Sequence, residues 1–111
     1  MEIVITDEEG VTLLELSGRM DATTAAEFDN AVRALPRQGA RLLIDMAGLE
    51  YISSAGLRSI LGLVKSVRTS AGKLAFCALQ PMVAEVFRIS GFTAMLAVCD
   101  SRDEARVALR G

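Results

Sequence analysis

The 111-residue sequence contains no histidine and no tryptophan, and it has only one tyrosine and two prolines. Without histidine, the chain lacks the commonest general base, the commonest zinc ligand and any Ser-His-Asp or Cys-His arrangement. It also lacks a GxxxxGK[ST] phosphate loop, a dinucleotide-binding glycine fingerprint and a cluster of metal-ligand residues. These absences predict a protein that is not an enzyme and that carries no metal or cofactor.

Long apolar runs and an excess of positive charge are also absent. No apolar segment approaches the roughly 20 residues needed to cross a bilayer, and the first ten residues lack the basic start and long apolar centre of a signal peptide. The formal net charge is -2, so no large positive field is available to attract nucleic acid or anionic lipid. We therefore expect a cytoplasmic protein that neither binds nucleic acid nor inserts directly into a membrane.

Apolar residues make up 51% of the chain, which is enough to form one core. We expect residues 1–111 to form a single domain. The two cysteines, Cys77 and Cys99, lie far apart in the sequence, and each falls within an apolar run typical of a strand. Both are predicted to be buried, reduced structural thiols.

The spacing of apolar residues predicts a β-hairpin followed by alternating helices and strands, which indicates a mixed sheet with helices packed against it. Thr24 with Glu27, and Ser101 with Glu104, have the spacing of capping boxes. Gly18 is expected to end the second strand, and Gly91 to end a helix in the left-handed conformation. The expected strands are 2–6, 11–17, 41–46, 73–79 and 97–99, and the expected helices span about 24–35, 54–69, 81–90 and 101–110.

The segment IDMAGLEYISSAGLRSIL, residues 44–61, joins a buried strand to an amphipathic helix through a loop that carries two adjacent serines. One interpretation is structural, since serine is a preferred N-cap that contributes about 0.5–2 kcal/mol. The other is regulatory: a phosphate at a helix N-terminus adds about -1.5 to -2 charges, which the free N–H groups accommodate and a docked partner does not.

Three stretches together resemble the STAS family, and in particular the bacterial anti-sigma factor antagonists, over essentially the whole chain. They are TLLELSGRMDATTAAEF, LLIDMAGLEYISSAGLRSILGLV and VFRISGFTAMLAVCDSRDEA. The middle stretch is the most specific, because it places an aspartate, an aromatic-apolar pair, small hydroxyl residues and Gly-Leu at fixed distances. The resemblance implies an α/β STAS fold, with a mixed central β-sheet and about four helices packed against it.

The resemblance also implies a function. In this family the unphosphorylated domain binds an anti-sigma factor, a serine kinase of the histidine-kinase-like ATPase fold, and so frees a sigma factor. The kinase phosphorylates a serine or threonine at the start of the helix, and a PP2C-type phosphatase removes the phosphate. The alternative keeps the fold and changes the circuit: an adaptor subunit of a stressosome, or of a secretion or lipid or anion transport complex, that does not act on a sigma factor.

Carried onto this chain, the phosphate acceptor is Ser54, with Ser53 and no phosphorylation as alternatives. The commonest family pattern is Asp-Ser-Ser-Gly-Leu, with the acceptor directly before glycine. Here Ser53 stands in the position of the aspartate and Ala55 in the position of the acceptor. The interpretation we favour is that the acceptor has moved by one residue to Ser54.

Further residues are predicted to support the acceptor or to bind the partner. Asp21 is expected to lie near the phosphorylation loop, or else to cap the helix that follows it. Asp45 is expected to hold that loop through backbone N–H groups, unless it only forms a turn, and Gly56 to allow close packing at the helix start. The predicted docking face lies on the outward side of the helix and consists of Arg58, Ser59, Gly62 and Lys65; the alternative for Arg58 is a solvated surface side chain.

Overall fold

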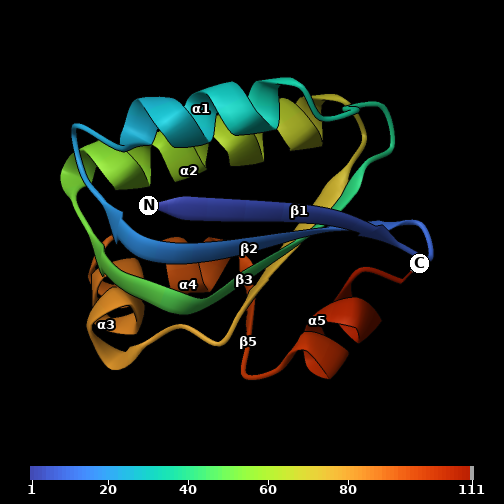
Figure 1. Cartoon of the computed structure of the whole chain (residues 1–111). Helices are drawn as coiled ribbons and strands as arrows, with labels where there is room; N and C mark the ends of the chain where they lie inside the picture. Colours follow the sequence, from blue (N-terminus) through green and yellow to red (C-terminus); the bar gives the residue numbers. More distant parts are fainter. Residues whose placement is uncertain (111) are drawn as a thin grey trace.

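The computed structural model describes residues 1–110 and has a five-stranded sheet with helices on both faces (Figure 1). The strand order is β1-β2-β3-β4-β5; β1 is antiparallel to β2, and all other neighbours are parallel. The predicted mixed α/β sheet is therefore confirmed. The strands are β1 (Glu2–Glu8), β2 (Val11–Met20), β3 (Arg41–Ile52), β4 (Lys73–Cys77) and β5 (Ala97–Cys99), and the helices are α1 (Ala25–Arg33), α2 (Ser54–Thr69), α3 (Pro81–Ile89), α4 (Phe92–Met95) and α5 (Arg102–Ala108).

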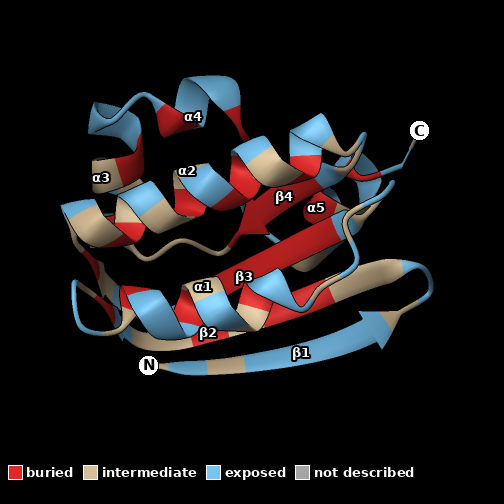
Figure 2. Ribbon diagram, turned by 90° about the horizontal axis from the view of Figure 1, so that it is seen from above, coloured by how far each residue is buried: buried red, intermediate tan, exposed pale blue. Residues whose placement is uncertain are grey.

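The central strand β3 explains how the layers are held together. Side chains of a strand alternate between the two faces of the sheet, and both faces of β3 are covered. Ile44 packs in the larger core with α1, α2 and α3, whereas Leu43 packs in a smaller core against Ala105 and Leu109 of α5. Figure 2 shows the helices α1 and α2 lying across the sheet, with α3 and α4 beside α2.

The hairpin between β1 and β2 has a shorter turn than the sequence predicted. Glu9 and Gly10 have φ angles of 50° and 83°, which are the positive values that a two-residue type I′ turn requires. Asp7 and Glu8 belong to the strand and pair with Thr12 and Val11. The polar residues before the turn are thus strand residues on the exposed edge of the sheet.

Gly18, which was expected to end the second strand, lies inside it, and the third strand extends beyond its expected end at residue 46. Gly18 has a φ of 92°, yet β2 continues to Met20, and β3 continues past Gly48 to Ile52. The register between the strands shifts at Glu15/Ser17 and at Gly18/Arg19. The glycines therefore permit irregularities in the strand pairing and do not end the strands. The prediction that β4 continues to residue 79 was also wrong, because Ala78 takes a φ of 59° directly after Cys77.

The helix count was predicted as about four, and the structure adds a fifth, short helix. Gly91 is left-handed with a φ of 81°, as predicted, and α4 follows it at once. Four residues are too few to give a helical periodicity, so the sequence pattern did not reveal α4. Its first residue, Phe92, packs edge-on against Phe87 with 5.3 Å between the ring centroids.

One predicted capping box is present in part and the other is wrong. Ser101 Oγ accepts a hydrogen bond from Glu104 N–H at 3.2 Å, while the Glu104 carboxylate accepts from the backbone of Asp100. Thr24 stands at the N-cap of α1, but its side chain makes no capping hydrogen bond in the described structure. The Thr24 hydroxyl instead donates to the carbonyl of Arg19, because the preceding turn directs it toward β2.

The cysteines are neighbours in the sheet. Cys77 of β4 and Cys99 of β5 are register partners, and both are reduced. Cys77 is fully buried, as predicted, and burial together with nearby Asp45 raises the pKa of its thiol to about 11. Cys99 is only half-buried, because β5 lies at the edge of the sheet.

Candidate functional site at the start of helix α2

The site lies where two parallel strands end side by side. The carboxyl ends of β2 and β3 are adjacent, and Ser53 N–H donates a 2.9 Å hydrogen bond to the carbonyl of Met20. The segment from β2 into α1, which begins at Asp21, therefore lies beside the segment from β3 into α2, which contains Ser53 and Ser54. This edge is where loops in α/β proteins commonly carry function.

The two adjacent serines have different environments. Ser53 is the N-cap of α2, with an extended backbone, and its Oγ accepts a hydrogen bond from Gly56 N–H at 3.2 Å. Ser54 is the first residue of the helix and is exposed, and its hydroxyl makes no hydrogen bond to any residue of 1–110. The structural role that serine often has at a helix start is thus filled by Ser53, and the Ser54 hydroxyl is left open to solvent.

Gly56 brings the start of α2 against the end of β2. A Cβ atom at this position would lie 2.8 Å from Met20 Cγ and from Ile52 Cγ1, and 3.0 Å from the carbonyl oxygen of Met20. The position therefore has no room for a side chain. The close contact fixes the direction in which the helix leaves the strand, and with it the position of Ser54.

Asp21 is bound within its own turn. Its Oδ1 accepts hydrogen bonds from the Thr23 hydroxyl at 2.7 Å, from Thr23 N–H at 2.9 Å and from Thr24 N–H at 3.1 Å. These bonds, above all that from the Thr23 hydroxyl, hold the pKa of Asp21 below its ordinary value. None of the hydrogen bonds that the described structure gives Asp21 reaches Ser53 or Ser54, so the aspartate orders the entry to α1 beside them.

Asp45 lies away from the serine loop, which corrects the expectation that it holds that loop. Strand β3 continues to Ile52, so Asp45 is in mid-strand, and its carboxylate is on the face that α5 covers. Oδ1 accepts from Ala47 N–H at 2.9 Å, and Oδ2 accepts from Arg102 Nε at 2.6 Å. Arg102 was not predicted from the sequence; the signal was a carboxylate within an otherwise apolar strand, which needs a hydrogen-bonding or charged partner when it is buried.

A second pair that the sequence analysis missed lies beside the serines. The guanidinium of Arg19 stacks over the ring of Tyr51, 4.2 Å from its centroid, and the two residues are register partners in β2 and β3. Such a contact is favourable by cation–π attraction. It joins the ends of the two strands that carry the site.

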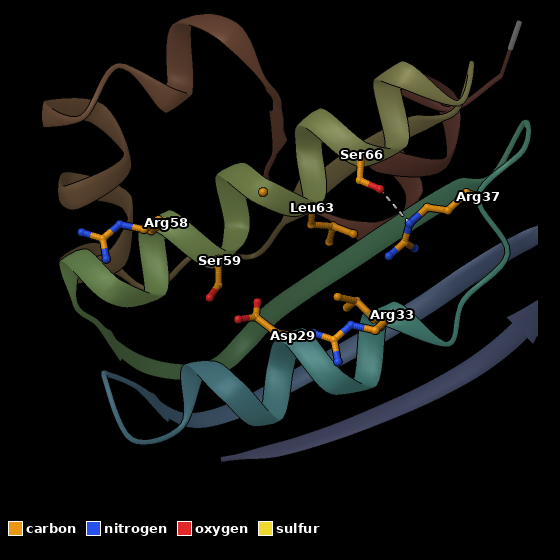
Figure 3. Close-up of a pocket in the computed structure, with 9 residues that line it drawn as sticks. Asp29, Arg33, Arg37, Arg58, Ser59, Leu63 and Ser66 are labelled. Carbon is orange, nitrogen blue, oxygen red and sulfur yellow. Dashed lines mark hydrogen bonds between the residues drawn. The ribbon is translucent and has the colours of Figure 1, made fainter.

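Of the four predicted docking residues, Arg58, Gly62 and Lys65 are exposed and Ser59 is half-buried. All but Lys65 line a groove of about 450 Å³ between α1 and α2 (Figure 3). The remaining groove residues are Asp29, Val32, Arg33, Arg37, Leu63 and Ser66. The predicted docking face is thus one wall of a groove whose other wall is α1.

Within residues 1–110, no group of three or more Cys, Asp or Glu side chains is placed to hold a metal ion. None of the helices in that range combines the length and apolar character needed to cross a membrane.

Comparison with known proteins decides the family. The family model of the STAS domain matches residues 2–105. The chain belongs to the STAS family. One relative, BtrV of Bordetella bronchiseptica, is named as a candidate anti-sigma factor antagonist; it is 35% identical over 111 residues, which cover 99% of this chain and 96% of that protein. The family resemblance noted from the sequence is therefore confirmed.

Solved structures support the same fold. An anti-sigma factor antagonist from Mycobacterium paratuberculosis matches 99% of this STAS chain and 94% of its own, with a TM-score of 0.87 and 23% identity. The anti-sigma factor antagonist SpoIIAA in its unphosphorylated form matches 96% of both chains, with a TM-score of 0.77 and 17% identity. The phosphorylated form of SpoIIAA, from Bacillus, matches with a TM-score of 0.74 and 19% identity over 98% of this chain and all of that one. At these identities the matches concern the fold, and they confirm the STAS architecture.

Proposed function

We propose that this STAS protein is an anti-sigma factor antagonist in a cytoplasmic partner-switching circuit. Unphosphorylated, it binds an anti-sigma factor that is a serine kinase of the histidine-kinase-like ATPase fold. Phosphorylation of Ser54 by that kinase releases the complex, and a PP2C-type phosphatase restores binding. The chain itself acts as a binding switch and not as an enzyme.

The exposed hydroxyl of Ser54 carries this proposal. A kinase needs an acceptor that it can reach without unfolding the substrate, and Ser54 is exposed and engaged in no hydrogen bond within the described residues. Ser53 is the weaker candidate, because its Oγ already accepts the hydrogen bond from Gly56 N–H. The commonest acceptor position of the family is occupied by Ala55, which has no hydroxyl.

The helix tolerates a phosphate at this position. Residue 54 lies in the first turn of α2, where free N–H groups and the helix dipole favour negative charge. The first turn of α2 contains no acidic side chain that would repel the phosphate. Arg58 follows four residues later on the same side of the helix and can pair with the phosphate. The fold should therefore survive phosphorylation while the charge at the helix start changes.

The negative charge of a phosphate on Ser54 would lie within the surface that the partner contacts. In the proposed complex the partner contacts the start of α2 and the docking residues Arg58, Ser59, Gly62 and Lys65. The close packing at Gly56 keeps the start of α2 in place, and the turn at Asp21 orders the neighbouring entry to α1. A phosphate adds about -1.5 to -2 charges at the centre of that contact. Acidic groups of the partner would be repelled by this charge, and apolar groups would have to desolvate it, so the complex would weaken. Binding would change, whereas the fold would not.

The first test is intact-mass and peptide mass spectrometry of the protein isolated from its native cells. We expect one phosphate, assigned to Ser54, that is lost in Ser54→Ala and retained in Ser53→Ala. A phosphate assigned to Ser53 would overturn the choice of acceptor. Its absence across growth conditions would overturn the switch and favour the adaptor subunit of a stressosome, secretion or transport complex.

The second test measures binding to the kinase-fold anti-sigma factors of the same organism. We expect Ser54→Ala to bind at least as well as the unmodified protein and to resist phosphorylation. Phosphorylated protein should bind weakly, with a thermal midpoint close to that of the unmodified protein; Ser54→Asp should show part of this loss, since a carboxylate carries less charge than a phosphate. Equal binding by the phosphorylated and unmodified proteins would contradict the mechanism.

A further inference from the structure

The groove between α1 and α2 has a second end, away from Ser54, where positive charge gathers. Arg33 of α1 and Arg37 of the segment after it both line the groove there, together with Ser66 of α2. Neither arginine has a carboxylate oxygen within 4.0 Å among the described residues. Two arginines without an ion pair therefore line one groove, together with the carboxylate of Asp29, on a chain whose formal net charge is -2.

Arg37 is held in place but is not fully satisfied. Its Nε donates a 2.9 Å hydrogen bond to Ser66 Oγ, which ties the segment after α1 to α2 (Figure 3). Its Nη1 is buried and has no acceptor anywhere in residues 1–110. A shielded guanidinium N–H without an acceptor is unfavourable, and a small rotation of the Arg37 side chain would let this group donate to an oxyanion in the groove.

Arg33 is positioned to contribute to the same site. Its Nη1 donates to Asn30 Oδ1 at 2.8 Å, a bond to a neutral amide that leaves the positive charge and the other guanidinium donors unmatched. Arginine presents its donors in a planar fork, which fits the oxygen atoms of a phosphate. Both guanidinium groups and the Ser66 hydroxyl line the groove. Figure 3 shows the Arg33 side chain extending toward Asp29, so it must swing toward Arg37 for both to hold one phosphate.

We infer that this end of the groove binds the phosphate group of a small phosphate monoester. A phosphate monoester carries close to two negative charges at neutral pH, which matches the charges of Arg33 and Arg37; a monocarboxylate would neutralise only one. The groove volume of about 450 Å³ lies within the range of small-molecule sites. Figure 3 shows Asp29 and Ser59 facing each other farther along the groove, where they can accept hydrogen bonds from hydroxyl groups of the ligand body.

The phosphate end of this site is distant from Ser54, although Ser59 and Gly62 of the proposed docking face line the same groove. Ser66 follows Ser54 by twelve residues, which corresponds to about 18 Å along a helix. The inference does not depend on the proposed function, because its binding groups are Arg33, Arg37 and Ser66. Ligand binding should therefore be the same in the protein and in its Ser54→Ala variant.

The test is a titration of the ¹⁵N-labelled full-length chain with glycerol 3-phosphate and with orthophosphate, followed by amide chemical shifts at constant ionic strength. We expect saturable shifts at residues 33, 37, 62 and 66. Arg37→Gln and Arg33→Gln should each weaken the apparent Kd about tenfold or more, as expected for loss of a charge-assisted hydrogen bond. The matched control Arg88→Gln, on the exposed surface of α3, should leave the Kd unchanged.

Three outcomes would overturn the assignment. Shifts that do not saturate, or that sodium chloride reproduces, would mean that only general ionic effects occur. Binding that Arg33→Gln and Arg37→Gln leave unchanged would place the phosphate elsewhere. Preferential binding of acetate or succinate would make the site a carboxylate site. Ser66→Ala, which removes only one hydroxyl, provides a further test if Arg37→Gln does not fold.

Discussion

Arg102 of α5 donates a 2.6 Å hydrogen bond from Nε to Oδ2 of Asp45 in the middle of β3, although 57 residues separate them. Its Nη2 also donates to Glu15 of β2 at 2.8 Å. Asp45 is the one charged side chain in the buried set of residues 1–110. The hydrogen bond between Asp45 and Arg102 is the main reason why the pKa of Arg102 is raised above its ordinary value. The pair fastens the C-terminal helix to the sheet.

Replacing Arg102 should therefore destabilise the protein. Arg102→Met keeps much of the apolar stem but leaves the Asp45 carboxylate buried without its guanidinium partner. We expect the free energy of unfolding to fall by about 1–3 kcal/mol, measured by urea denaturation. In the double variant Asp45→Asn with Arg102→Met, part of this loss should be recovered, because no unpaired charge stays buried.

The control is an arginine in an exposed ion pair. Arg88 pairs with Glu85 on α3, and both side chains are more than half exposed. Arg88→Met should change the free energy of unfolding by no more than about 0.5 kcal/mol. Equal losses in Arg102→Met and Arg88→Met would show that the contact between α5 and the sheet does not depend on Asp45.

Substitution of Ser53 should lower the stability of the protein, whereas substitution of Ser54 should leave it nearly unchanged. Ser53→Ala removes the oxygen that accepts from Gly56 N–H, so the free energy of unfolding should fall by about 0.5–2 kcal/mol. Ser54→Ala should change it by less than about 0.5 kcal/mol, because the hydroxyl has no hydrogen-bond partner in the described structure. Ser53→Asp, which restores a capping oxygen, should regain most of the stability. A larger loss for Ser54→Ala than for Ser53→Ala would contradict the assigned N-cap.

Two glycines of the same helix should respond in opposite directions to alanine. At Gly56 a Cβ would lie 2.8 Å from Met20 Cγ, and overpacking of this kind costs about 1–3 kcal/mol. At Gly62 a Cβ would meet no atom within 4 Å, so Gly62→Ala should raise the free energy of unfolding by about 0.5–1 kcal/mol through helix propensity. Urea denaturation of both variants checks this. If Gly56→Ala is as stable as Gly62→Ala, the close contact of α2 with β2 is not restrictive.

Sequence patterns predicted the order of the large elements, because apolar periodicity reports directly which residues face a core. The nearly continuous apolar run of residues 41–46 predicted the central strand, and Ser101 predicted the start of the last helix. What failed were features that depend on neighbouring strands. Gly18 was predicted to end its strand, but in the sheet Gly18 and Gly48 lie where the pairing of β2 with β3 shifts register.

At the candidate site, too, local features were predicted from the sequence, and contacts between distant residues were not. The strand-to-helix pattern located Ser53 and Ser54 at the start of α2, and the structure distinguishes them by hydrogen bonding. The role of Ser54 as a phosphate acceptor stays a prediction. The partner of Asp45 could not be predicted, because a salt bridge across 57 residues leaves no local pattern. Nor could the groove at Arg37, which exists only where α1 and α2 pack together.

The turn at Asp21 predicts how the protein responds to acid. Hydrogen bonds from Thr23 and Thr24 hold the folded-state pKa of Asp21 below its ordinary value of 3.8. The charged carboxylate therefore stabilises the fold above that value, and this contribution is lost as the pH falls through the lower folded-state pKa. Asp21→Asn keeps a capping oxygen but removes the charge. Its free energy of unfolding should be below that of the unmodified protein at neutral pH, and the difference should shrink once the pH falls below 3.8.

Urea denaturation followed by far-ultraviolet circular dichroism, repeated at a series of pH values, measures this difference. Asp29→Asn is the matched control, because the Asp29 carboxylate accepts no hydrogen bond in the described part of the chain. A stability difference for Asp21→Asn that persists unchanged at the lowest pH would mean that the variant disturbs the turn itself. A difference that vanishes with acid would mean that the charge on Asp21 orders the entry to α1, beside the loop that presents Ser54.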